Sequence, residues 1–158
     1  MKNHNIIIFS SIDWTTHWQI HHQLTSSLIE SDNRVLFIEN IGVRSPSFKD
    51  LNRVKSRIKS RINSTHGFSV EETRLTILSP IFIPLPYNKL AIYLNSLLIS
   101  RSIKSWAKRA NFNNFIVISF LPTPTIHEII KIISPSLTIY YCADDMARTL
   151  KNPASLNF

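Results

Sequence analysis

Five short apolar runs punctuate the chain, and longer segments with apolar residues at helical spacing separate them. The first run, Ile6–Phe9, is rich in β-branched side chains, a composition typical of a strand buried on both faces of a parallel sheet. Similar runs occupy Val35–Ile38, Leu75–Leu78, Phe115–Phe120 and Leu137–Cys142. The pattern therefore predicts five buried strands.

The first predicted helix follows a loop at Ser10–His17. Its apolar residues recur every four positions and are Ile20, Leu24 and Leu28. The polar Ser31–Asn33 ends it, and we expect His17 and His21 to lie on one side of it. This helix and the strands on either side of it form a βαβ unit.

A second helix is predicted after the proline-bearing segment Ser79–Asn88, which favours neither a strand nor a helix. One apolar face of this helix contains Leu90, Leu94, Leu97 and Leu98. Cations near its end suit the helix dipole, and the asparagines from Asn111 onward stop it. Tyr93 and Trp106 are expected to pack against the core or its edge.

A third helix is predicted to begin at Pro124, with Thr123 as its capping residue. Its apolar positions follow the i, i+3, i+4, i+7 pattern and are Ile126, Ile129, Ile130 and Ile133. Strands and helices thus alternate, with no hairpin signal between the strands. This order predicts an α/β, Rossmann-like three-layer sandwich with a mostly parallel sheet, as one domain over residues 1–158.

A fourth amphipathic segment lies between the second and third strands. Leu51, Val54, Ile58 and Ile62 form its narrow apolar stripe, and basic residues fill the other sides. It is either a solvated surface helix or a helix that contacts anionic membrane lipid. The polar stretch Asn63–Glu72, which contains Gly67, is predicted to be a loop.

Composition narrows the possible functions. The net charge of +8 implies an acidic partner, and much of it lies in one patch formed by Lys49, Arg53, Lys55, Arg57, Lys59 and Arg61. The only two glycines rule out the usual dinucleotide and P-loop motifs. No apolar stretch reaches the length of about 20 residues that spans a bilayer, and no secretory signal is present, so we expect a cytoplasmic location. The single cysteine, Cys142, is interpreted as a packed thiol rather than a nucleophile.

Polar groups follow the predicted strands at their carboxyl ends, where open parallel sheets bind ligands. They are Ser10, Ser11, Asp13, Trp14 and His17 after the first strand, Glu39 and Asn40 after the second, Leu121–Thr125 after the fourth, and Asp144 and Asp145 after the fifth. Ser10–Leu24 also holds two of the three tryptophans. We therefore expect the functional site at this edge.

Three kinds of chemistry fit these groups. His17 and His21, with Asp144 or Asp145, could hold a metal ion, although two histidines alone are a weak signal. His22 or Asp145 could act as a general base on a hydroxyl group. The two aspartates could also hold a divalent ion with a phosphate, or cap the next helix.

Several motifs resemble the N-terminal half of bacterial glycosyltransferases of the GT-B fold, the kind that makes cell-surface polysaccharide and teichuronic acid. They are Ser10-Ser11-Ile12-Asp13-Trp14, Trp18-Gln19 with His22-Gln23-Leu24, and Tyr141-Cys142-Ala143-Asp144-Asp145. The resemblance covers most of the chain. Ile20-His21 replaces the family's Arg-Pro, which removes a charge, and Tyr141 replaces an acid.

The resemblance implies a transferase that moves a sugar from a nucleotide-sugar to a hydroxyl group of a glycan or lipid-linked acceptor. The N-terminal domain of such enzymes mainly binds the acceptor. The implied catalytic residues are His22 and Asp145, and the implied substrate-binding residues are Ser11, Asp13, Trp14, Trp18, Gln19 and Asp144. We expect no cofactor and no metal in this chain, and a truncated product that is inactive without the donor-binding C-terminal domain.

Family members often dock on the inner membrane face, and the resemblance extends this expectation to the basic segment. The residues predicted to contact an anionic surface are Lys55, Arg57, Lys59 and Arg61, beside Ile58 and Ile62. The alternative is a non-enzymatic module, either flavodoxin-like or a basic module that binds nucleic acid or another anionic ligand. A receiver domain would need an aspartate where Ser79-Pro80 follows the third strand, and aromatic residues do not interleave with the basic run, so nucleic acid is not expected.

Overall fold

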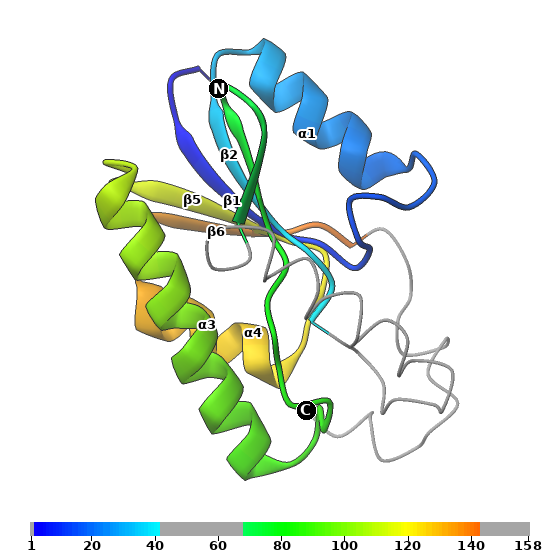
Figure 1. The fold of residues 1–158 in the computed structure, drawn as a ribbon, viewed down its shortest axis with the longest axis vertical. Helices are drawn as coiled ribbons and strands as arrows, with labels where there is room; N and C mark the ends of the chain where they lie inside the picture. Colours follow the sequence, from blue (N-terminus) through cyan, green and yellow to red (C-terminus); the bar gives the residue numbers. More distant parts are fainter. Residues whose placement is uncertain (1, 42–67, 143–158) are drawn as a thin grey trace.

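A single sheet organises the part of the chain that the computed structural model describes, residues 2–41 and 68–142 (Figure 1). Its six strands are β1 (Asn5–Phe9), β2 (Arg34–Ile38), β3 (Phe68–Glu72), β4 (Leu75–Leu78), β5 (Phe115–Ser119) and β6 (Leu137–Tyr140), in the order β3-β4-β2-β1-β5-β6. Five of them are parallel to one another, and β3 pairs antiparallel with β4. The architecture is α/β and compatible with a Rossmann-like fold.

The strand order reverses between β1 and β5. From β1 the chain adds β2 and then β4 on one side, and it later returns to add β5 and β6 on the other side. In an open parallel sheet, such a reversal leaves a crevice at the carboxyl ends of the two strands, because their following connections lead away in opposite directions. The β1–β5 switch point is therefore the place where this fold favours a ligand.

Helices cover both faces of the sheet (Figure 1). The helix α1 (Ile20–Glu30) covers one face, where Leu24 and Leu28 pack against a buried cluster that includes Ile6, Ile8 and Phe37. The helices α3 (Lys89–Arg109) and α4 (Pro124–Ile133) cover the other face, over a cluster that includes Ile7, Phe9 and Leu36. Because successive strand residues point to opposite faces, each buried strand contributes to both cores.

Side chains cap the beginnings of two helices. Asn88 Oδ1 accepts a hydrogen bond from Ala91 N at 3.0 Å and caps α3. Thr123 Oγ1 accepts from Ile126 N at 3.3 Å, and Pro124 is the first residue of α4. The predicted cap and start of this helix are thus confirmed, as are the βαβ unit and the predicted strands at β1, β2, β4, β5 and β6.

The segment before β4 differs from the prediction. Residues Phe68–Glu72 were expected to be part of a loop, yet they form β3 and make an antiparallel hairpin with β4. The prediction of a sheet without hairpins is therefore wrong at this position. The edge of β4 offers unpaired backbone groups, and satisfying them outweighs the polar composition of the added strand.

The helix α3 carries its larger apolar side chains on the outside. Leu90, Tyr93 and Leu98 are 66%, 60% and 52% exposed. The buried face consists mostly of small or polar residues: Ala91, Asn95, Ser96, Ile99, Ser100, Ile103 and Ala107. The predicted leucine face exists but points away from the core, and the packing role predicted for Tyr93 is wrong. Trp106 does pack at the core, stacked on Phe68 with ring centroids 6.0 Å apart.

The last described strand lies at the edge of the sheet, and little of it is covered. Three of the four residues of β6 are exposed, and Cys142 beyond it is exposed as well. The prediction of a packed thiol is therefore wrong, because an edge strand lacks a neighbour on one side. The basic segment that contains Lys55, Arg57, Lys59 and Arg61 and the pair Asp144 and Asp145 lie outside the described residues. No helix within residues 2–41 and 68–142 is long and apolar enough to cross a membrane.

Candidate functional site

The loop after β1 reaches the switch point and is held there by its own serine. Ser10 continues the strand pairing, since its N–H donates to Ile38 O at 2.9 Å. Its side-chain oxygen accepts from Ile12 N at 3.1 Å, which turns the chain out of the sheet. Asp13 and Thr16 close a second turn, in which Thr16 N donates to Asp13 O at 3.1 Å. The backbone therefore leads directly from a buried strand to the exposed residues that precede α1.

His21 and Ser11 form a hydroxyl–imidazole pair at this switch point. Ser11 Oγ lies 2.9 Å from His21 Nε2, and the His21 ring packs on Phe120 with centroids 4.0 Å apart. Ser11 follows β1, and Phe120, which the His21 ring contacts, follows β5. His21 therefore connects the ends of the two strands between which the sheet order reverses. His21 also lies in the first turn of α1.

His22, the predicted general base, is 1% exposed, and backbone groups engage both of its ring nitrogens. Nδ1 accepts from Gln19 N at 3.1 Å, so Nε2 carries the proton and donates to Trp14 O at 2.9 Å. His22 thereby fixes the backbone on both sides of the loop tip. Its catalytic role stays a prediction, and one of these hydrogen bonds would have to break before His22 could accept a substrate proton.

Two predicted tryptophans pack around His22 but differ in exposure. Trp14 is half-buried and lies edge-on against Phe37, with ring centroids 5.0 Å apart. Trp18 stacks on His22 at 5.0 Å with an interplanar angle of 20°, and it is 63% exposed. Trp18 therefore presents to solvent a flat aromatic surface that is supported from below by His22.

Glu39 braces the same edge of the sheet. Its carboxylate is 8% exposed and accepts from Trp14 N at 2.8 Å through Oε1 and from Ser79 Oγ at 2.5 Å through Oε2. These bonds join the segments that follow β1, β2 and β4. Sequence reasoning placed Glu39 at the rim of the site but did not foresee this bracing role, because nothing in the sequence pairs it with Trp14 or Ser79.

The other predicted site residues differ in how exposed they are. Asp13 is half-buried, Gln19 is exposed at the start of α1, and His17 is exposed in the preceding loop. His17 and His21 do not share a helix face, because α1 begins only at Ile20. Within the described residues, no group of three or more histidines, cysteines or acidic residues could hold a metal ion.

The end of β6 adds a tyrosine with altered acidity. Tyr140 is exposed, but partial desolvation of its hydroxyl group, followed by a hydrogen bond with Cys142, raises its pKa. The next residue, Tyr141, packs on Phe120 with ring centroids 4.9 Å apart. Aromatic contacts therefore extend from His21 through Phe120 to the end of the sheet.

The site thus combines a hydroxyl–imidazole pair, an exposed indole and a rigid carboxylate brace at one end of the sheet. Comparisons with protein-family models, with curated proteins and with solved structures found no match to the chain.

Proposed function

We propose that the chain is the acceptor-binding domain of a GT-B-type glycosyltransferase, which moves a sugar from a nucleotide-sugar to a hydroxyl group of a cell-surface glycan or lipid-linked acceptor. The observation that carries the proposal is the Ser11–His21 pair, whose Oγ and Nε2 atoms are 2.9 Å apart at the carboxyl end of β1. A hydroxyl group at this distance is within reach of proton transfer. The sequence resemblance supports the same reaction class.

In the proposed reaction, His21 takes the role of general base. The acceptor oxygen bonds to the anomeric carbon while the bond to the nucleoside diphosphate breaks, and the leaving group keeps the electron pair. The acceptor proton passes to His21 Nε2, at the position where Ser11 Oγ now lies. His22 then serves to hold Trp14 and Gln19 in place, since its two nitrogens already bind their backbone groups.

Trp18 is proposed as the platform for the acceptor sugar. The C–H groups on one face of a pyranose pack well on an indole ring, and aromatic side chains that bury one face and expose the other suit such ligands. His22 covers one face of Trp18, so a sugar would use the other. Asp13 and Gln19 are proposed to bind its hydroxyl groups, and Asp144 and Asp145, outside the described residues, complete the predicted set.

Glycan binding tests this proposal without requiring transfer. Tryptophan fluorescence is followed while oligosaccharides derived from cell-envelope polysaccharide are added to the 158-residue chain. We expect a saturable change that is lost in Trp18→Ala and in His21→Ala but kept in the control Trp106→Phe, whose ring lies between Phe68 and Phe112. A panel of such glycans that leaves the fluorescence unchanged, or changes it equally in Trp18→Ala, contradicts the proposal.

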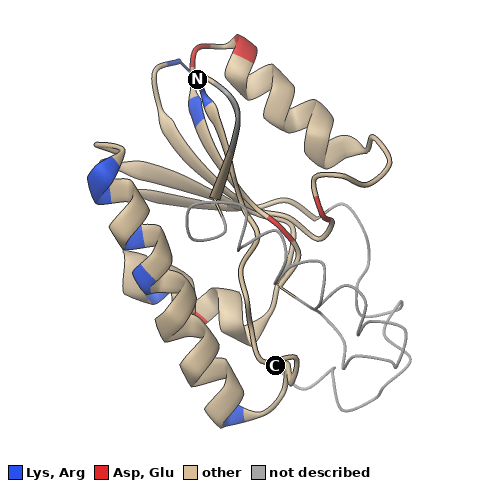
Figure 2. Ribbon diagram, in the orientation of Figure 1, with Lys and Arg blue, Asp and Glu red and all other residues tan. Residues whose placement is uncertain are grey.

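We also propose that the domain works at the inner membrane face, as expected for lipid-linked acceptors. Lys55, Arg57, Lys59 and Arg61 are the predicted contacts. The outer face of α3 supports the idea independently, because the exposed leucines of its first half give way to the cations Arg101, Lys104, Lys108 and Arg109 (Figure 2). The helix has no acidic residue. Each cation near an anionic surface contributes about 1 kcal/mol.

Co-sedimentation with vesicles tests this location. We expect binding that rises with the fraction of anionic lipid and falls when Leu90 and Leu98 are both changed to glutamine. Leu137→Gln is the matched control, since Leu137 is 48% exposed but lies on β6. Changing the four cations of the basic segment to glutamine measures how much they contribute to vesicle binding. Vesicle binding that changes neither with the fraction of anionic lipid nor in the α3 variants contradicts this location.

A further inference from the structure

The carboxyl edge of the sheet continues past the hydroxyl–imidazole pair, along the ends of β5 and β6. These two strands follow β1 in the order of the sheet. Strand pairing extends one residue beyond each of them. Phe120 N donates to Phe9 O at 3.0 Å. Tyr141 N donates to Ser119 O at 2.8 Å, so backbone hydrogen bonds hold Phe120 and Tyr141 next to each other at this edge.

Tyr141 lies on the face of the sheet that α1 covers. Ile139, which points to the same face two residues earlier, packs against the buried cluster under α1 that contains Phe120. The Tyr141 ring packs on Phe120 with ring centroids 4.9 Å apart, and the His21 ring packs on Phe120 at 4.0 Å. One buried phenyl ring thus contacts both the proposed general base and Tyr141.

The Tyr141 ring has one supported side and one open side. Phe120, which supports it, is 5% exposed, whereas Tyr141 is 37% exposed. Neighbouring strands are about 4.8 Å apart, so the backbone at Tyr141 lies roughly 10 Å from the end of β1. A single pyranose ring with a hydroxyl group at His21 is shorter than this distance, whereas the next sugar of a glycan chain reaches Tyr141.

Charged side chains are absent from this part of the edge. The described residues 114–123 and 137–142, which include β5, β6 and the segments that follow them, contain no lysine, arginine, aspartate or glutamate. The whole chain, in contrast, has a net charge of +8. An aromatic ring in this neutral setting suits the C–H face of an uncharged sugar better than a phosphate group.

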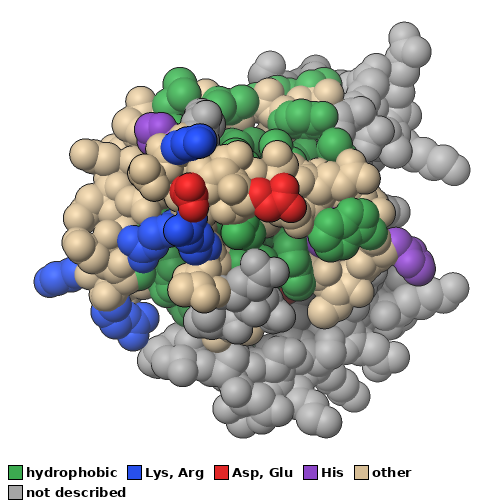
Figure 3. All heavy atoms as spheres, turned by 90° about the horizontal axis from the view of Figure 1, so that it is seen from above, with side chains coloured by type: hydrophobic (Ala, Val, Ile, Leu, Met, Phe, Trp, Pro, Cys, Tyr) green, Lys and Arg blue, Asp and Glu red, His purple; other side chains and the backbone are tan. Residues whose placement is uncertain are grey.

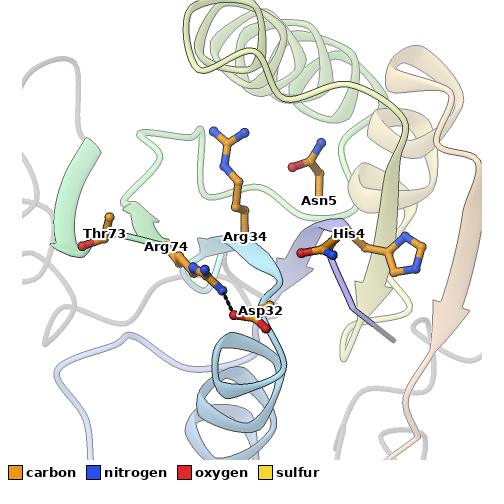
Figure 4. Close-up of a pocket in the computed structure, with 7 residues that line it drawn as sticks. His4, Asn5, Asp32, Arg34, Thr73 and Arg74 are labelled. Atoms are coloured by element: carbon orange, nitrogen blue, oxygen red, sulfur yellow. Dashed lines mark hydrogen bonds and ion pairs between the residues drawn. The ribbon is translucent and has the colours of Figure 1, made fainter.

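The opposite end of the sheet offers no comparable surface among the described residues. The hollow at the starts of β1 and β2 has no phenylalanine, tyrosine or tryptophan in its lining (Figure 4). Its arginines already have partners, since Arg74 pairs with Asp32 and Arg34 donates to Ala110 O at 2.6 Å. Figure 3 looks onto this end, where basic and acidic side chains lie near one another. A further sugar-binding surface is therefore expected at the carboxyl edge.

We propose that Tyr141 forms a second sugar subsite and that the acceptor is an oligosaccharide, which lies along the carboxyl edge from β1 toward β6. The first sugar of this acceptor is the one whose hydroxyl group reaches His21, so the subsite rests on the proposed function. The second sugar packs on the open side of the Tyr141 ring. Two linked sugars therefore bind more tightly than one, and Tyr141 contributes only to the longer ligand.

Fluorescence titrations with glycan fragments of increasing length test the subsite. The probes are the mono-, di- and trisaccharide fragments of the cell-envelope polysaccharides, added to the 158-residue chain. We expect the disaccharide to bind about fivefold more tightly than the monosaccharide, as one additional aromatic contact predicts. Tyr141→Ala removes this gain and leaves the affinity for the monosaccharide unchanged, which also shows that the variant is folded. Tyr141→Phe keeps the gain, because the ring remains.

The matched control is Tyr93→Ala, which removes a tyrosine that is 60% exposed on α3. It should bind every fragment as the parent chain does. Equal affinities of the parent chain for the mono- and disaccharide overturn the subsite but leave the proposed function standing, as does an equal loss of both affinities in Tyr141→Ala. If Tyr141→Ala weakens the binding of a nucleoside diphosphate and leaves the glycan affinities unchanged, the ring serves the donor and the subsite is overturned. A failure of every fragment to bind overturns the proposed function together with the subsite.

Discussion

Replacing His22 by alanine removes two hydrogen bonds and an aromatic support at once. The imidazole accepts from Gln19 N at 3.1 Å and donates to Trp14 O at 2.9 Å, so it connects the tip of the loop after β1 to the first turn of α1. Its ring also contacts Trp14 at 4.8 Å and Trp18 at 5.0 Å between centroids. If His22 acts as a structural brace, this change destabilises the fold and detaches Trp18 from its support.

The magnitude follows from these contacts. A hydrogen bond contributes about 0.5–1.5 kcal/mol, and an aromatic pair contributes about 0.5–1.5 kcal/mol. Gln19 is exposed, so water can replace its partner, whereas Trp14 is half-buried. We therefore expect His22→Ala to lower the free energy of unfolding by about 2–4 kcal/mol, including the cavity left by the ring. His22→Gln should cost about half as much, because a glutamine three residues after the capping residue can still accept from Gln19 N.

Urea denaturation monitored by far-ultraviolet circular dichroism measures both values. The control is His17→Ala, which alters an exposed histidine of the same loop and should change the free energy by less than about 0.5 kcal/mol. An effect of His22→Ala below about 1 kcal/mol would refute the bracing role. In that case the hydrogen bonds to His22 would contribute little to the free energy of unfolding, and the result would favour its predicted role as a general base.

Three further predictions concern stability. Asn95→Ala should lower the free energy of unfolding by about 2 kcal/mol, because the buried Asn95 amide accepts from Ile83 N at 2.7 Å and donates to Ile83 O at 2.9 Å; an unchanged urea midpoint would contradict this. Thr123→Ala should cost about 1 kcal/mol by removing the cap of α4, whereas Thr123→Ser should cost clearly less, and equal losses in the two variants would argue against the cap. Since the pKa of Tyr140 is raised in the folded state, its stabilising contribution is present below the ordinary tyrosine pKa of about 10 and is lost as the pH rises further. Thermal unfolding between pH 9 and pH 11 should therefore show a smaller alkaline loss in Tyr140→Phe than in the parent chain, and identical losses would count against the shift.

The fold could largely be predicted because the strands are buried on both faces. Ile6–Phe9 and Val35–Ile38 have no polar interruption, and the helices between the strands carry caps and periodic apolar residues. The misjudged elements depend on contacts distant in sequence. β3 exists because β4 offers an edge to pair with, and α3 turns its small residues inward because α4 and the sheet lie close to it.

The topology explains why the candidate site was expected at this edge of the sheet, but it does not give the contacts of the individual residues. The carboxyl ends of parallel strands converge, so a polar rim followed from topology alone. The position at which α1 begins decides which of the two adjacent histidines faces a hydroxyl group and which binds backbone. The helix begins at Ile20, so His17, which was predicted to share a helix side with His21, lies outside the helix.

The central claim is that an acceptor hydroxyl group binds His21 at the switch point while His22 only supports the loop. Nitrogen NMR of the histidine rings during titration with cell-envelope oligosaccharides tests it most directly. The claim predicts that the Nε2 resonance of His21 shifts saturably and that the resonances of His22 keep the pattern of a ring bound to backbone through both nitrogens. Saturable shifts at His22 with none at His21, or no shift at either ring at glycan concentrations that change Trp18 fluorescence, would contradict it.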